Sequence, residues 1–249
     1  MARLCKADSA IRIGRSCAPL DDDTGDDRLD HGRNRSISFM RIAPRIIAGL
    51  ALAALVVAPA TAGNLGQTYR ATLNPLNAGS HTVGDVTYTI PSAHGTATVT
   101  LKGDDVTVQI MVNGVTPLTL HPQHVHAGTT CPSASDDTNS DGFVDVIEGL
   151  PKYGPILVSL DTTINTGASS DLNFPVANAS GSYSYSASGS RSHIQDEIMT
   201  ALKLGTRHVV IHGISPTGMP LPASVQSLPG LPAWATLPVA CGELHLTSK

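Results

Sequence analysis

One stretch of the chain, residues 121–150, concentrates the side chains that could bind metal ions. It contains a complete match to the calcium-loop pattern D-x-[DN]-x-[DN]-G-x₅-E, which starts at Asp137 and ends at Glu148. Calcium takes six to eight oxygen ligands, so carboxylates and amides must recur along a tightly coiled loop. We expect the ligands to be the side-chain oxygens of Asp137, Asn139 and Asp141, the Phe143 carbonyl, Asp145 directly or through a water, and both oxygens of Glu148.

The alternative for the same loop, residues 137–148, is an acidic surface turn that binds no metal. Gly142 stands where the loop must turn sharply, and Val144 supplies the apolar residue expected shortly after it. Because every specified position of the pattern is matched within one short segment, the sequence favours calcium over the plain turn.

Four histidines form two pairs with strand-like spacing. Residues two apart in a strand point to the same side, so His124 and His126 would present both imidazoles on one face, about 7 Å apart. His208 and His212 also have an even separation and share a face. Imidazole pairs of this kind suit copper or zinc. The alternative is that these histidines only pack and hydrogen-bond within a sheet, and spacing alone favours that alternative.

Residues 1–62 are not expected to belong to the mature protein. Residues 1–39 are charged and have too little apolar content to bury a core, so we expect a disordered N-terminal extension or a stretch that precedes the true start of translation. Residues 40–62 have the charged start, the apolar run (46–58) and the A-x-A site of a secretory signal, so we expect translation to start at Met40. The alternative is a cytoplasmic tail on a signal anchor. We expect one domain, residues 63–249, that is secreted or periplasmic after cleavage near Ala62.

Charge and cysteine content narrow the function of the 63–249 domain. Its 7 Lys and Arg stand against 13 Asp and Glu, a net charge of −6, so we expect no nucleic-acid partner. The apolar run before it is too short for a stable membrane span. Cys131 and Cys241 are the two cysteines left, and an even pair in an exported chain indicates a disulfide.

Alternating apolar and polar residues predict an all-β fold. The sequence from Gly95 to Val112 reads as a hairpin around Gly103-Asp104-Asp105. Seven or eight short strands favour an antiparallel Greek-key sandwich or barrel. The other strands are expected at 67–73, 86–90, 118–120 leading towards His126, 153–160, 181–187, 208–212 and 239–246, with a long loop at 215–238.

One short helix is expected late in the chain. Ser192 and Gln195 form a capping box, and Gly205 stops the helix. Between them, apolar residues recur every fourth position at Ile194, Ile198 and Leu202.

Four segments within residues 95–246 form a recognisable set. They are GTATVTLKGDDVTVQIMVNGVTP, then HVHAG followed by a cysteine, then RHVVIHGI and ACGEL. Together they resemble the Cu,Zn superoxide dismutase fold and the chordin-type (CHRD) domain. The resemblance implies a superoxide dismutase-like sandwich, and a disulfide that ties the loop after HVH to the A-C-G strand, matched here by Cys131 and Cys241.

The same resemblance implies a copper site. His124 and His126 match the two ligands of the dismutase HVH strand, and His212 matches the ligand that ends a VVH strand. His193 and His121 are candidates for a fourth ligand. The metal-bridging and zinc-binding histidines of the dismutases are missing, because the interval after Cys131 holds the calcium loop instead, so zinc is not expected.

Two classes of function follow. Leu237-Pro238-Val239 stand before the A-C-G motif, where the dismutases carry the arginine that guides superoxide. We therefore expect an exported, calcium-binding CHRD/superoxide dismutase-like sandwich, a non-catalytic binding or structural module whose protein or surface partner the sequence does not identify. The alternative is a copper-only superoxide dismutase, or a copper carrier, that uses His124, His126 and His212.

Serine-hydrolase, zinc-protease and phosphate-loop motifs are absent from the sequence.

Overall fold

The computed structural model describes residues 66–164, 170–191 and 204–248. All of them belong to the unit that begins at Ala58, and the first unit, Met1–Val57, lies outside the described residues. The expected N-terminal extension and signal segment, residues 1–62, lie outside the described residues. So do residues 192–203, which hold the helix expected to start at Ser192.

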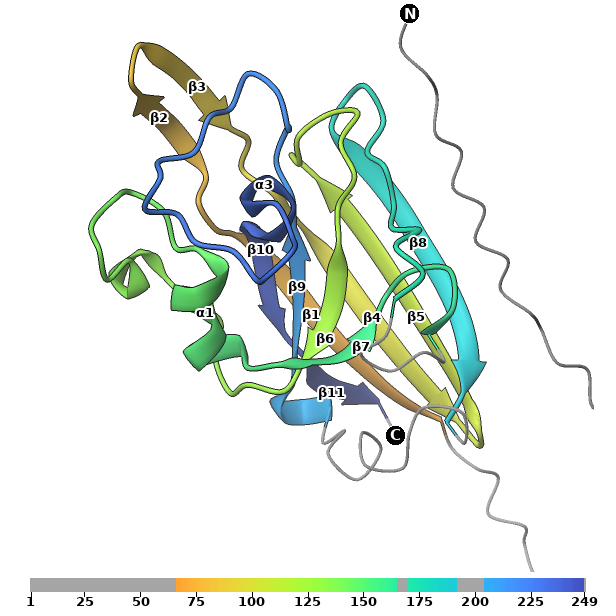
Figure 1. The fold of residues 1–249 in the computed structure, drawn as a ribbon. Helices are drawn as coiled ribbons and strands as arrows, with labels where there is room; N and C mark the ends of the chain where they lie inside the picture. Colours follow the sequence, from red (N-terminus) through yellow and green to blue (C-terminus); the bar gives the residue numbers. More distant parts are fainter. Residues whose placement is uncertain (1–65, 165–169, 192–203, 249) are drawn as a thin grey trace, which may run out of the picture. The chain divides into compact units, whose positions relative to one another are not determined.

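Within these ranges, nine strands form one antiparallel sheet (Figure 1). The main path runs β7-β6-β9-β10-β1-β4-β5-β8, and β11 also pairs with β1. Consecutive strands β5 and β6, and again β7 and β8, lie in different halves of this path, so the chain crosses between halves. The all-β antiparallel fold is confirmed. The strands of this sheet are β1 (Gln67–Pro75), β4 (His94–Lys102), β5 (Asp105–Asn113), β6 (Gln123–His126), β7 (Ile156–Ser159), β8 (Ser182–Ser190), β9 (His208–His212), β10 (Pro238–Glu243) and β11 (His245–Ser248).

The β4–β5 hairpin shows why the sequence folds into a half-buried sheet. Val99 pairs with Val108 across the two strands, and both are buried in the core. The threonines that alternate with the apolar residues of β4 face the other side of the sheet. Gly103, with φ of 61°, makes the turn in the left-handed region where glycine has no steric cost. This hairpin confirms the expected one within a residue at each end.

Tyrosines on β8 join the two halves of the sheet. Tyr183 donates its hydroxyl hydrogen to Oε1 of Gln123 on β6 at 3.1 Å. Tyr185 donates to the carbonyl oxygen of Asp161, just after β7, at 2.8 Å. Apolar side chains from both halves fill the space between them in one core cluster. Burial in a sandwich of this kind fixes the faces of β6 and β9 on which the histidines stand.

A helix and a strand that the sequence did not indicate lie beside the loop of residues 137–148. Helix α1 (Val146–Tyr153) includes the last three residues of the loop and contains Pro151, which disfavours a helix. The strand expected at 153–160 was therefore wrong at its start, since Tyr153 ends α1 and β7 begins at Ile156. Strand β3 (Val86–Ile90) confirms the strand expected there, and it pairs with the unexpected β2 (Gly79–Val83) in a separate two-stranded sheet.

Three smaller differences from expectation occur at turns. Residues 118–120 form no strand: Leu118 has φ of 54°, and only Leu120 makes a bridge, to Val176. The last expected strand is divided at Leu244 into β10 and β11. Short helical turns are present at η1 (Ala134–Asp136), η3 (Leu204–Thr206) and, within the expected loop, α3 (Ala233–Thr236).

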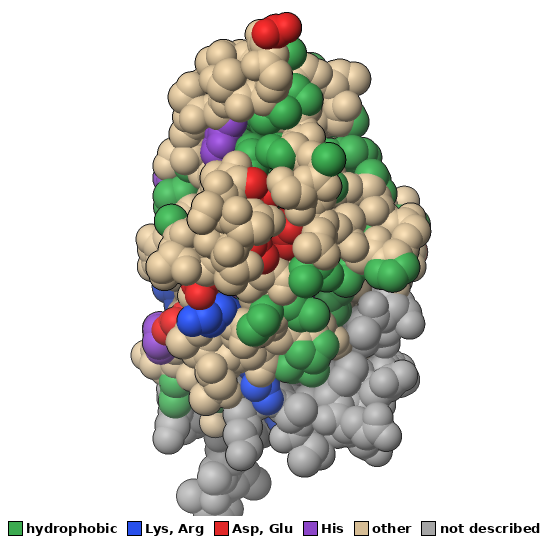
Figure 2. Space-filling model, turned by 60° about the vertical axis from the view of Figure 1, so that its left-hand side comes forward, with side chains coloured by type: hydrophobic (Ala, Val, Ile, Leu, Met, Phe, Trp, Pro, Cys, Tyr) green, Lys and Arg blue, Asp and Glu red, His purple; other side chains and the backbone are tan. Residues whose placement is uncertain are grey.

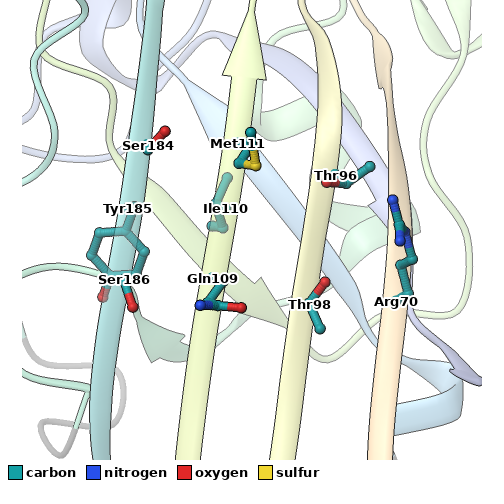
Figure 3. A pocket seen from close by; sticks show the side chains of 9 residues that line it. All are labelled: Arg70, Thr96, Thr98, Gln109, Ile110, Met111, Ser184, Tyr185 and Ser186. Atoms are coloured by element: carbon teal, nitrogen blue, oxygen red, sulfur yellow. The ribbon is translucent and has the colours of Figure 1, made fainter. Parts of the chain in front are cut away.

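A shallow pocket lies on the outer face of β1, β4, β5 and β8 (Figure 3). Its lining includes Arg70, the threonines Thr96 and Thr98, Gln109 and Met111. No histidine, cysteine, Asp or Glu contributes to this lining. The candidate metal ligands therefore lie elsewhere.

Candidate metal centre

Neighbouring strands β6 and β9 position the candidate histidines. His124 pairs with Val210, and His126 pairs with His208, in antiparallel register. Val125 points into the core, so His124 and His126 face the opposite side of the sheet. That side is also covered, because His124, His126 and His212 are only 8%, 3% and 4% exposed.

The three imidazoles of His124, His126 and His212 converge. Each offers one ring nitrogen to a set in which all atoms lie within 4.8 Å of one another. In the part of the chain that the structure describes, this is the only group of three or more His, Cys, Asp or Glu side chains that meets that distance. The ring centroids are 5.4 to 5.8 Å apart. The two segments that hold them are separated by more than eighty residues in the sequence, so the strand pairing brings the group together.

Backbone carbonyls fix which nitrogen two of the rings turn towards the centre. Nδ1 of His126 lies 2.7 Å from the Gly154 oxygen, and Nδ1 of His212 lies 2.8 Å from the Thr236 oxygen. A carbonyl oxygen only accepts, so each Nδ1 carries the hydrogen and each Nε2 keeps its lone pair. Both Nε2 atoms, and Nδ1 of His124, are buried without a hydrogen-bond partner. Buried polar atoms are normally paired, and three unpaired ones in one cluster fit a metal ion.

Burial keeps the three imidazoles neutral. It lowers the pKa of His126 to about 3, helped by repulsion from His212 and opposed by the hydrogen bond to Gly154. It lowers the pKa of His212 to about 4, against the hydrogen bond to Thr236. Burial, then repulsion from His212 and His126, holds the pKa of His124 well below its usual value. At neutral pH all three rings are therefore in the form that binds metal ions.

Aromatic side chains wall the centre. The Phe174 ring packs edge-on against the His124 ring, with centroids 5.4 Å apart. The ring of Tyr153, the last residue of α1, packs edge-on against the His126 ring, with centroids 4.7 Å apart. The Tyr153 hydroxyl donates to the carbonyl oxygen of Val146, and burial raises its pKa well above the usual value. Tyr153 therefore remains a neutral wall residue rather than a phenolate ligand.

Other histidines considered as ligands lie outside the centre. The two ring nitrogens of His121 each lie 3.0 Å from a backbone carbonyl oxygen, of His212 and of Thr116, so His121 cannot be the fourth ligand. His208 is buried with Nε2 3.6 Å from a Glu243 oxygen, and is not part of the group. His193 lies outside the described residues.

The acidic loop of residues 137–148 folds back on itself. Asp137 accepts hydrogen bonds from the backbone N–H groups of Asp141 and Gly142. Glu148 reaches back to the start of the loop, where its Oε1 accepts from Thr138 and Asn139. In the view of Figure 2, acidic side chains gather near the middle of the surface that faces the reader. The loop is thus coiled rather than extended, and only its last three residues belong to a helix, α1.

The individual loop residues differ in how free their oxygens are. Asp141 accepts from Phe143 N–H with one oxygen, and its Oδ2 is buried without a hydrogen-bond partner. Phe143 is buried in the core, while Asn139 is exposed. Asp145 is fully buried and caps α1. The acidic side chains of the loop do not form a group within the 4.8 Å that the histidines meet.

Asn77 and His81 hold this loop against the sheet. The Asn77 side chain accepts from Val144 N–H and donates to the carbonyl oxygens of Val144 and Pro238. His81 of β2 stacks on Phe143 with ring centroids 4.4 Å apart. Sequence reasoning missed both, because contacts across more than sixty residues leave no local pattern.

The expected disulfide is present between Cys131 and Cys241, with their Cα atoms 5.8 Å apart. It joins the segment before the acidic loop to β10. Cys241 packs with Tyr153 and Val210, beside the histidine centre. The disulfide therefore anchors the loop segment to the strand next to β9.

No protein-family model and no curated protein matches the chain. No helix among the described residues is long and apolar enough to cross a membrane.

Proposed function

We propose that this protein is an exported copper-binding module on a superoxide dismutase-like or chordin-type β-sandwich, with His124, His126 and His212 as the copper ligands. The observation that carries the proposal is the convergence of three neutral, buried imidazoles whose inward nitrogens have no hydrogen-bond partner. A set of imidazole nitrogens suits copper, which also binds more tightly than the other divalent first-row metals at a given site. Copper bound there would supply one-electron redox chemistry.

The chain's own residues support binding more than turnover. The dismutase arginine that guides superoxide has no counterpart at Leu237-Pro238-Val239. Phe174 and Tyr153 cover two of the rings. Copper carriage or storage is thus the proposed role, and a copper-only superoxide dismutase is the second candidate, favoured by the same three ligands.

Calcium at residues 137–148 is the second part of the proposal. The motif, the coiled loop and the unpaired Oδ2 of Asp141 support it. Bound calcium would hold together acidic side chains that repel one another when no cation is present. It would therefore stabilise the folded domain rather than take part in copper chemistry.

Copper loading tests the proposal directly. The metal-free protein is incubated with Cu(II), excess metal is removed, and bound copper is measured. We expect one copper per chain in the wild type, and its loss in His126→Ala and His212→Ala. His245→Ala is the matched control, because that side chain is 70% exposed and lies outside the centre. Copper that remains in the His126 and His212 variants, or preferential zinc binding, contradicts the proposal. A superoxide assay of the loaded protein separates a carrier from an enzyme.

A further inference from the structure

The carbonyls of Gly154 and Thr236 orient His126 and His212. The segments that contain these carbonyls are both linked by hydrogen bonds to one buried carboxylate, that of Asp145. Its Oδ1 accepts from the N–H groups of Ile147 and Glu148 at 2.8 and 3.0 Å, which starts helix α1. The same helix ends at Tyr153, and the next residue, Gly154, provides the oxygen for His126. The position of that oxygen therefore depends on where α1 begins.

The second oxygen of Asp145 leads to the other carbonyl. Asp145 Oδ2 accepts from Gln226 N–H at 2.6 Å. The next residue, Ser227, makes a hydroxyl–hydroxyl hydrogen bond of 2.9 Å to Thr236. Thr236 then offers its carbonyl oxygen to Nδ1 of His212.

We propose that Asp145 is the positioning residue of the copper site, holding the carbonyls of Gly154 and Thr236 in place for His126 and His212. The inference deepens the proposed function and rests on it. Asp145 is suited to this role because it is fully buried, and its two oxygens accept hydrogen bonds from two segments that are remote in sequence. Groups that orient metal-binding histidines typically change metal affinity by about 10- to 100-fold when removed.

The first test observes the metal-free protein by NMR. Nδ1–H signals of His126 and His212 report their hydrogen bonds to Gly154 and Thr236 without any copper. In Asp145→Asn the amide nitrogen replaces one acceptor, so we expect both signals to shift or to be lost through solvent exchange. Asp161→Asn is the matched control, because Asp161 is equally buried and accepts two backbone N–H groups elsewhere. In Asp161→Asn both Nδ1–H signals should keep their wild-type positions and intensities.

A second variant keeps the inference testable if Asp145→Asn does not fold. Ser227→Ala removes the hydrogen bond to Thr236, together with the one that Ser227 donates to the Leu231 carbonyl oxygen, and leaves the branch through Gly154 intact. We therefore expect the His212 signal to change and the His126 signal to stay. An unchanged His212 signal in Ser227→Ala, or two unchanged signals in folded Asp145→Asn, overturns the inference.

Copper affinity is the complementary readout. Competition with a chelator should show a loss of about tenfold or more for Asp145→Asn, and less than about threefold for Asp161→Asn. Equal losses in the two variants overturn a specific role for Asp145. Failure of the wild type to bind copper contradicts the proposed function instead, and the NMR comparison then decides the positioning role alone.

Discussion

His126 donates its Nδ1 hydrogen to the carbonyl oxygen of Gly154 over 2.7 Å, so its Nε2 remains for a metal ion. Gly154 can make this contact because it has φ of 71° and lies directly against the backbone of Gly128. A Cβ at position 154 would meet the Gly128 nitrogen at 2.6 Å. One glycine thus joins the end of α1 to the orientation of a candidate ligand.

Gly154→Ala tests this link. The added Cβ must push the 127–128 backbone away and move the His126 acceptor, so we expect a loss of both folding stability and copper affinity. Gly218→Ala is the matched control, because Gly218 has nearly the same φ, 73°, and open space around it. The control should lose about 1–2 kcal/mol of unfolding free energy from backbone strain alone and keep its copper affinity. Denaturant titration and copper competition measure the two effects, and equal behaviour of the two variants would contradict the link.

Acid should destabilise the metal-free protein through the buried histidines. Their folded pKa values, about 4 for His212 and about 3 for His126, lie below the ordinary value of 6.5. The unfolded chain therefore binds more protons in this range, and the unfolding free energy falls as the pH drops from about 6.5 towards 4. The slope is at most about 1.4 kcal/mol per pH unit for each histidine.

Urea unfolding between pH 7.5 and 4.5 measures this dependence. His126→Gln should show a shallower slope, because one of the titrating groups has been removed. A wild-type stability that does not change across the range would show that the rings are not buried as neutral imidazoles.

Calcium should raise the thermal midpoint of the wild type relative to the chelated protein. At a concentration 100 times the dissociation constant, a ligand that binds only the folded state adds about 2.7 kcal/mol. Glu148→Gln should abolish the shift, since it removes a charge from the proposed closing ligand. Asp85→Asn, at an exposed turn outside the loop, should keep it. An identical thermal midpoint with calcium and with chelator would contradict calcium binding and show that the loop is an acidic surface turn.

Removing the disulfide should lower stability substantially. The bridge closes 110 residues, and loss of a native disulfide commonly costs about 2–5 kcal/mol. We expect this loss in the double variant Cys131→Ala/Cys241→Ala, measured by denaturant titration. Reductant should destabilise the wild type but leave the double variant unchanged. A wild type insensitive to complete reduction would argue against this role.

The fold was largely predictable because its pattern is local. The alternation of Thr and Val along residues 95–112 fixes both the hairpin and its buried face. The disulfide followed from the two cysteines left in the 63–249 domain and from its expected export. Helix α1 was missed because Pro151 masks it, although Asp145 and Glu148 form a capping box that could have indicated its start.

The centre was predictable only in part. The spacing of His124 and His126 places both on one face, but nothing local brings His212 to them, and that link came from a family resemblance. The roles of Gly154 and Thr236 depend on backbone carbonyls, which have no signature in a sequence. Phe174 and Asn77 act across long separations in the chain. His121, a candidate fourth ligand in the sequence, is excluded by its two carbonyl contacts.

X-ray absorption at the copper edge of the loaded wild-type protein tests the central claim most directly. The account predicts three imidazole nitrogens at about 2.0 Å from copper, with the multiple-scattering pattern of histidine rings. A shell of oxygen donors without imidazole scattering would place the metal elsewhere and contradict a centre formed by His124, His126 and His212.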